Sequence, residues 1–198
     1  MGILDFWLLR CKSLQKRILL LTGPPGIGKT TVLTRTVEAL REKGYRVGGM
    51  ISREAREGNA RVGFEIIDLT NGKHGWLARI DQKAGPQVGK YRVNLSDLEN
   101  IGATAISEAA EECAAVAVDE VGPMELFSQK FKTAVRQALD SKKLMLAVIH
   151  AKAQDPLISY AKQREDAALY TLNLGNRQNM PETFSEAALT YLNDQQVT

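Results

Sequence analysis

Hydrophobic residues follow two alternating patterns along the chain. Short continuous apolar runs, typical of buried strands, occur at residues 17–22, 45–52, 114–118, 144–149 and 167–174. Between them, apolar positions recur every three or four residues, which predicts amphipathic helices at 31–43, 96–113, 125–141, 156–164 and 181–193. Strands that alternate with helices predict an α/β fold with a doubly wound, mostly parallel sheet.

Residues 53–94 depart from this alternation. Residues 53–59 are polar and predict a turn, while residues 62–69, 76–80 and 88–94 predict three strands. Residues 70–73 form a hairpin-type turn signal between the first two of these strands. We therefore expect one domain over residues 1–198, with a β-rich hairpin insertion at about 53–94.

Residues 1–16 form an N-terminal extension ahead of the first predicted strand. Asp5 interrupts its apolar sequence and no basic region precedes it, so it is a poor signal peptide. Phe6 stands where a myristoylation motif needs Ser or Thr. The pattern favours a short helix packed on the body, with self-association or a membrane-surface contact as alternatives. No apolar run approaches the length of a membrane span, so we expect a cytoplasmic protein.

Composition excludes several classes of function. The formal net charge of +3 and the lack of a Lys/Arg run provide no strong signal for nucleic acid. Two cysteines, Cys11 and Cys113, are too few for a disulfide framework. With only two histidines in the chain, a cysteine/histidine zinc site is excluded. The oligomeric state stays open.

One motif matches a phosphate-binding loop in full. It consists of Gly23, Pro24, Pro25, Gly26, Ile27, Gly28, Lys29 and Thr30, between a predicted strand and a predicted helix that opens with Thr31. Glycines let backbone N–H groups converge on phosphate oxygens, and the helix N-terminus adds partial positive charge. We expect these residues to bind a nucleotide, with Lys29 at the terminal phosphates and Thr30 as a Mg²⁺ ligand. A glycine turn that only packs a helix on a sheet is the less favoured alternative.

Two acids follow the apolar strand at residues 114–118. Asp119, at the carboxyl end of that strand, is placed to hold Mg²⁺ together with the phosphate loop. Glu120 is then positioned to orient or deprotonate a water against the terminal phosphate. This predicts Glu120 as the catalytic base of a hydrolase, with an exposed or salt-bridged side chain as the alternative.

Further candidates carry weaker signals. Arg164 ends a short predicted helix and could supply positive charge to a transition state, or could be a solvated helix terminus. Arg177 follows the last predicted strand, where it could meet a nucleobase or be surface charge. His150 could sense the terminal phosphate or be a core histidine, and Glu125 could be a supporting acid or a first-turn Glu. We expect no role for His74, in a turn.

In this combination the chain resembles the THEP-type nucleoside-triphosphatases, small P-loop proteins related in fold to the RecA/AAA-like ATPases. The resemblance covers roughly residues 17–185 and rests on Gly23–Thr30 and on residues 61–64, 88–91 and 118–126. It implies Mg²⁺-dependent hydrolysis of nucleoside triphosphates with broad tolerance of the base. It also supports Glu120 as base and a role for the segment that contains Lys162, Arg164 and Asp166.

Two features depart from the family pattern. Gln154 precedes Asp155 and Pro156 where the family usually carries a histidine before the proline, and the N-terminal extension lies outside the common pattern. The chain is predicted to hydrolyse nucleoside triphosphates. A nucleotide or nucleoside kinase, with Arg53, Arg56 and Arg61 as a lid, and a nucleotide-timed RNA- or protein-binding module remain alternatives.

Overall fold

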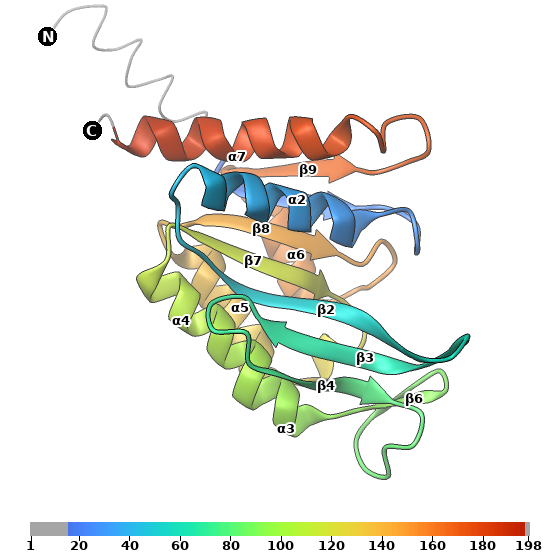
Figure 1. Cartoon of the computed structure of the whole chain (residues 1–198). Coiled ribbons are helices and arrows are strands. Elements are labelled where there is room, and N and C mark those ends of the chain that lie inside the picture. The colour runs from blue at the N-terminus through green and yellow to red at the C-terminus, as the bar shows by residue number, and fades with distance from the viewer. Residues whose placement is uncertain (1–15, 197–198) are drawn as a thin grey trace, which may run out of the picture.

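The computed structural model describes residues 16–196, whose strands lie in one nine-stranded sheet (Figure 1). The strands are β1 (Ile18–Thr22), β2 (Val47–Glu57), β3 (Ala60–Asp68), β4 (His74–Arg79), β5 (Gln87–Val88), β6 (Tyr91–Val93), β7 (Ala115–Val121), β8 (Leu144–Ile149) and β9 (Ala167–Thr171). The helices are α2 (Lys29–Glu42), α3 (Leu95–Asp97), α4 (Thr104–Glu112), α5 (Gln129–Asp140), α6 (Pro156–Gln163) and α7 (Met180–Gln196). A π-helical segment, Leu98–Ala103, joins α3 to α4, and a 3₁₀ turn, Glu125–Phe127, precedes α5.

The sheet has a parallel half and an antiparallel half. Its order is β5-β6-β4-β3-β2-β7-β8-β1-β9, and the strands from β2 to β9 in this order pair in parallel. From β3 outward all pairs are antiparallel, so the predicted insertion extends the sheet. In Figure 1 the arrows of β7, β8 and β9 point to one side, whereas β3 points back. The predicted α/β class with a mostly parallel core is confirmed.

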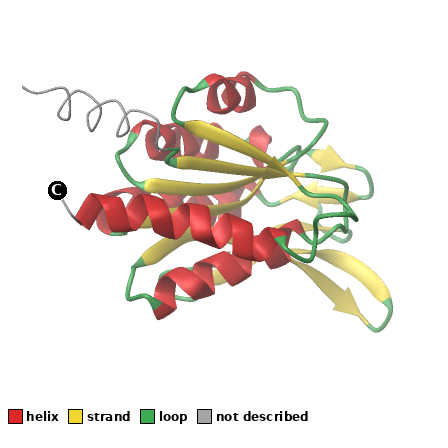
Figure 2. Ribbon diagram, turned by 90° about the horizontal axis from the view of Figure 1, so that it is seen from above, coloured by secondary structure: helices red, strands yellow, loops and turns green. Residues whose placement is uncertain are grey.

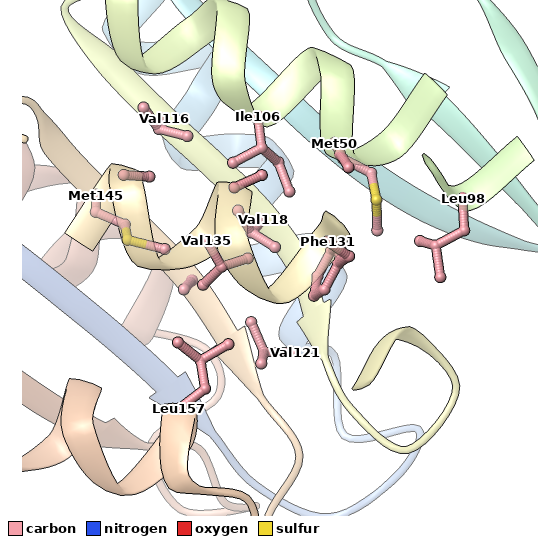
Figure 3. Packing of buried hydrophobic residues seen from close by; sticks show 14 of the residues in the cluster. Met50, Leu98, Ile106, Val116, Val118, Val121, Phe131, Val135, Met145 and Leu157 are labelled. Carbon is pink, nitrogen blue, oxygen red and sulfur yellow. The ribbon is translucent and has the colours of Figure 1, made fainter. Parts of the chain in front are cut away.

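Helices cover both faces of the sheet, because buried strand residues alternate between them. Leu19 and Leu21 of β1 face α2 and α7, which lie side by side and are joined by a hydrogen bond between the Thr36 and Ser185 hydroxyls (3.0 Å). Figure 2 shows α7 along this face. Ile18 and Leu20 point the other way, into the cluster beneath α4, α5 and α6 that Figure 3 shows in part. The parallel strands are therefore packed against helices on both faces.

Some predicted boundaries are wrong. The predicted turn at residues 53–59 is strand up to Glu57, because cross-strand pairs such as Arg53 with Glu65 stabilise a hairpin whose exposed tip is polar. The strand predicted at 88–94 is a small hairpin, β5 and β6. The helix predicted from Glu125 begins at Gln129, because the Ser128 side chain caps it by accepting from the Phe131 N–H (3.0 Å).

The predicted helix in the N-terminal extension lies outside the described residues. Among residues 16–196, no helix has the length and apolar character needed to cross a membrane.

Candidate functional site

The phosphate loop connects the carboxyl end of β1 to the start of α2, as the motif requires. Gly28 has a φ of 111°, a left-handed conformation that side chains rarely adopt. Gly23 lies so close to the chain after β9 that a Cβ there would be 2.6 Å from the Leu172 carbonyl oxygen. Thr22 anchors the entry to the loop, because its hydroxyl donates to the Ile149 carbonyl oxygen (3.0 Å).

Lys29, the first residue of α2, turns back over the loop. Its Nζ donates to the carbonyl oxygens of Gly23 and Pro24, each at 3.2 Å. The same Nζ lies 3.9 Å from Oε2 of Glu120, and the Lys29 side chain is only 10% exposed. The lysine charge is therefore held between the phosphate loop and the end of β7.

Asp119 lies on β7, where the register with β8 becomes irregular and the Asp119–Glu120 peptide bond is cis. Its side chain is buried, and its Oδ2 has no hydrogen-bond partner among the described residues. Burial raises the pKa of Asp119 to about 6, although a hydrogen bond from Thr30 opposes the rise. A buried carboxylate oxygen without a partner, next to a hydroxyl, fits a cation that prefers oxygen ligands.

Glu120 and Glu125 both lie close to Gly122. A Cβ at Gly122 would be 2.8 Å from Oε1 of Glu120 and 3.2 Å from Oε2 of Glu125. Glu120 is partly exposed, at 24% of its side chain, whereas Glu125 is buried. Burial raises the pKa of Glu125 to about 8, although its own N–H and that of Gly122 donate to it, and the charges of Glu120 and Asp119 raise the pKa further. A partly exposed acid thus borders the open space, and a buried one stands behind it.

A cleft of about 570 Å³ opens above these residues. One half, the phosphate half, is bounded by the phosphate loop, Asp119, Glu120, Glu125 and His150. The other, the insertion half, is bounded by residues of β2, β3 and their neighbours: Ser52, Arg53, Glu54, Arg61, Phe64, Leu77, Val88, Pro123 and Met124. A cleft of this size accommodates a small organic ligand.

The fold brings most of the predicted site residues together. Lys29, Thr30, Asp119, Glu120 and His150 all border the cleft. His150 Nδ1 accepts from the Lys152 backbone N–H (3.3 Å), so in the neutral ring Nε2 carries the proton and can donate. These site residues lie close together because the carboxyl ends of β1, β7 and β8 meet at one edge of the sheet.

Arg164, expected to supply positive charge to the transition state, does not border the cleft of its own chain. It precedes β9, and its guanidinium donates to Asp166 Oδ1 (2.9 Å), Asp140 Oδ1 (2.7 Å) and the Tyr160 hydroxyl (2.6 Å). Asp166 also forms an ion pair with Arg17, the residue before β1. These residues stand at the amino ends of the parallel strands, opposite the phosphate loop.

Arg177, a predicted site residue, and His74, for which no role is expected, lie outside the cleft. Arg177 is exposed in the loop after β9, and this loop adjoins the phosphate loop through the close contact of Leu172 with Gly23. His74 is exposed at the start of β4 and does not border the cleft.

Comparison with known proteins identifies the family. A family model described as NTPase matches residues 18–184. The chain belongs to this NTPase family. The nucleoside-triphosphatase THEP1 of Thermofilum pendens is 48% identical over 82% of this chain and 90% of its own length. The protein of the same name from Methanosarcina acetivorans is 44% identical over 86% of this chain and 96% of its own. The resemblance stated from the sequence is confirmed.

Solved structures support the same fold for this NTPase. The crystal structure of THEP1 from the hyperthermophile Aquifex aeolicus has a TM-score of 0.74 at 32% identity, covering 84% of this chain and 95% of that one. The solution structure of a human cancer-related nucleoside triphosphatase has a TM-score of 0.72 at 33% identity, covering 85% and 96%. The architecture described above is therefore the P-loop NTPase fold of this family.

Sequence reasoning missed two features of the NTPase site. The burial of Glu125 behind Glu120 depends on how the 3₁₀ turn packs, and no local pattern reports it. The second feature that the sequence did not predict is the insertion half of the cleft. Its residues Arg61 and Phe64 belong to a stretch that carries the family resemblance, so a signal existed, but the sequence did not indicate that this stretch faces the phosphate loop.

Proposed function

We propose that this protein hydrolyses nucleoside triphosphates to the diphosphate and phosphate in a Mg²⁺-dependent reaction for which Glu120 prepares the attacking water. The observation that carries the proposal is the position of Glu120. Its carboxylate borders the cleft 3.9 Å from the Lys29 Nζ, beside the buried carboxylate of Asp119. An acid beside the lysine that contacts the terminal phosphates faces the phosphorus that water must attack.

Thr30 and Asp119 would hold Mg²⁺. Both offer oxygen ligands, and the unpartnered Oδ2 of Asp119 faces no competing donor among the described residues. Residues 16–196 contain no group of three or more His, Cys, Asp or Glu side chains that could hold a metal alone. This fits Mg²⁺, which usually takes one or two protein ligands and completes its shell with phosphate and water. When bound, the ion offsets negative charge on the phosphates.

The remaining steps belong to side chains of the cleft. The N–H groups of the phosphate loop bind phosphate oxygens, and Lys29 exchanges its carbonyl partners for the terminal phosphates. Glu120 accepts a proton from the attacking water. At the same time the water oxygen bonds to the terminal phosphorus, and the bond between this phosphorus and the diphosphate breaks. His150, at the end of β8, can donate from Nε2 to the developing phosphate.

Broad tolerance of the base is part of the proposal. Backbone N–H groups and Lys29 contact phosphates that all nucleoside triphosphates share. Arg177 lies in the loop after β9, on the side of the phosphate loop away from Glu120, and we assign it to the nucleobase. An exposed arginine can stack on any base without reading its exocyclic groups.

The test is phosphate release from ATP, GTP, CTP and UTP, with and without Mg²⁺, by the wild type and by Glu120→Gln. The variant is expected to lose activity by about a hundredfold or more while binding the nucleotide, because Gln cannot accept the proton. Glu42→Gln, an exposed acid at the end of α2, is the control and should behave as wild type. A wild type that binds nucleotide tightly but releases almost no phosphate would refute the hydrolase and direct the search to an acceptor or a stimulating partner.

A further inference from the structure

The insertion half of the cleft has no task in the hydrolysis proposed above. Its floor is the face of β2 and β3 that also carries the buried core cluster, and Pro123 and Met124 form a wall on the side of β7. It is continuous with the phosphate half, because both border one hollow. A ligand in the insertion half would thus lie next to whatever occupies the phosphate loop.

The order of the strands shows which part of a nucleoside triphosphate comes near this half. Along the carboxyl edge the order is β9, β1 with the phosphate loop, β8, β7 with Glu120, then β2 and β3. Lys29, which reaches terminal phosphates, points from the loop toward Glu120. The terminal phosphate therefore lies on the β7 side and the nucleoside on the β9 side. The insertion half begins beyond the terminal phosphate, and this reasoning rests on the proposed function.

Arg61 is a cation of the insertion half that is hydrogen-bonded to two other side chains. Its Nε donates to the Tyr91 hydroxyl (2.9 Å) and its Nη1 to Oε1 of Glu54 (2.6 Å). Its guanidinium carbon lies 5.3 Å from the centre of the Phe64 ring. Its Nη2 has no hydrogen-bond partner among residues 16–196, and 42% of the side chain is exposed. Such an arginine offers a pre-oriented donor to an anionic group at little entropic cost.

The rest of the insertion half combines apolar and polar surface. Phe64, Val88 and Met124 offer apolar contacts, and Ser52 and Glu54 offer hydroxyl and carboxylate oxygens. Glu54 is held in place by Arg56 and Arg61. A ligand that fits needs a flat, weakly polar body, several hydrogen-bonding groups and one anionic group.

We propose that the insertion half binds a nucleoside monophosphate at the same time as the phosphate loop holds a triphosphate. The base would lie against Phe64, Val88 and Met124, the phosphate would accept from Arg61, and ribose hydroxyls would reach Ser52 or Glu54. The bound monophosphate lies on the side from which water approaches the terminal phosphate. It therefore lowers phosphate release while it occupies the site.

The first experiment titrates AMP, GMP, CMP and UMP into full-length protein already saturated with Mg²⁺ and a non-hydrolysable triphosphate. The expected result is saturable binding of one monophosphate per chain by calorimetry, with no release of the triphosphate. Binding only to the empty protein, with displacement by the triphosphate, would place the monophosphate on the phosphate loop and overturn the inference. No binding of any of the four would overturn it as well.

Two arginine variants locate the site. Arg61→Ala is expected to weaken monophosphate binding about tenfold or more, because a charge-assisted hydrogen bond is lost, with triphosphate affinity unchanged. Arg79→Ala is the matched control. Arg79 also pairs with an acid, Asp81, and lies over an aromatic ring, Trp76, but does not border the cleft. Equal affinities in Arg61→Ala and Arg79→Ala would overturn the assignment.

Hydrolysis measured on the same preparation without monophosphate separates this inference from the proposed function. Protein that hydrolyses triphosphates but binds no monophosphate refutes the inference alone. Protein that binds monophosphate beside a triphosphate but does not hydrolyse refutes the hydrolase alone.

Discussion

At the amino ends of the parallel strands acids meet arginines, whereas at the carboxyl ends acids meet one another. Burial alone would raise the pKa of Asp166, but Arg164 and Arg17 outweigh it and the pKa lies below its usual range. At the opposite edge, burial raises the pKa of Asp119 to about 6 and of Glu125 to about 8. The two edges thus shift the pKa values of carboxyl side chains in opposite directions.

This difference between the two edges distinguishes acids that stabilise the fold from acids that are available to a ligand. Among the amino-edge acids, Asp140 and Asp166 have their partners within the chain, so these ion pairs serve the fold. Asp119 keeps a buried oxygen without a partner among the described residues, a cost to stability that only a ligand can offset. Clusters of acids with raised pKa values are typical of functional sites for this reason.

Lys29→Ala at the carboxyl edge is expected to have the largest effect on activity. Hydrolysis is expected to fall about a thousandfold, because the main side-chain cation at the terminal phosphates is lost. The free energy of unfolding should change by less than about 1 kcal/mol, since the contacts of Lys29, with the loop carbonyls and with Glu120 Oε2, lie at the border of the cleft. Steady-state kinetics and urea unfolding check both, with exposed Lys43→Ala as control. A collapse of stability with Lys29→Ala would erase the distinction between the edges.

The pH dependence of stability tests the carboxyl edge without nucleotide or Mg²⁺. Because folding raises the pKa of Glu125 from about 4.5 to about 8, the unfolded chain loses this proton first as pH rises. Wild type should therefore lose stability between pH 4.5 and 8, by an amount on the order of a few kcal/mol at about 1.4 kcal/mol per unit. Glu125→Gln should lose much less over the same interval and exceed wild type at the upper end.

Thermal unfolding at several pH values compares wild type, Glu125→Gln and Glu108→Gln, an exposed acid on α4 as control. Parallel curves for all three would show that Glu125 is not buried as an acid in solution.

At the amino edge, Arg164→Ala is expected to cost about 2 kcal/mol of unfolding free energy, because its charge-assisted hydrogen bonds to Asp140 and Asp166 are lost. Activity per folded molecule should stay within about twofold of wild type. The control is Arg46→Ala, which removes an exposed ion pair with Glu112 and should cost less than about 1 kcal/mol. A hundredfold loss of kcat with the fold intact would make Arg164 catalytic, supplied from a second chain.

The smallest effect concerns the base. Arg177→Ala is expected to raise KM for all four triphosphates about fivefold with kcat unchanged, because a stacking contact worth about 1 kcal/mol is lost. Neighbouring Gln178→Ala, also exposed, serves as control. A loss confined to one base would contradict the proposed tolerance, and an unchanged KM would remove Arg177 from the site.

The predicted order of strands was already sufficient to place Arg164 away from the phosphate loop, although the interpretation of single residues did not use it. Arg164 comes just before a parallel strand, and the phosphate loop follows one, so the two belong to opposite edges of any such sheet. The helical position and the family pattern around Arg164 favoured a catalytic role, but the strand direction places Arg164 at the edge away from the phosphate loop of its own chain.

Local patterns alone predicted the phosphate-loop motif, the order of strands and helices in the parallel half, and the position of Lys29, Thr30 and Asp119 at one edge of the sheet. These features depend on residues a few positions apart or on the shared edge of parallel strands. Tertiary packing decided the burial of Glu125, the continuation of β2 into the insertion and the meeting of Arg61 and Phe64 with the phosphate loop. Burial and clefts arise between segments distant along the chain, so no local periodicity encodes them.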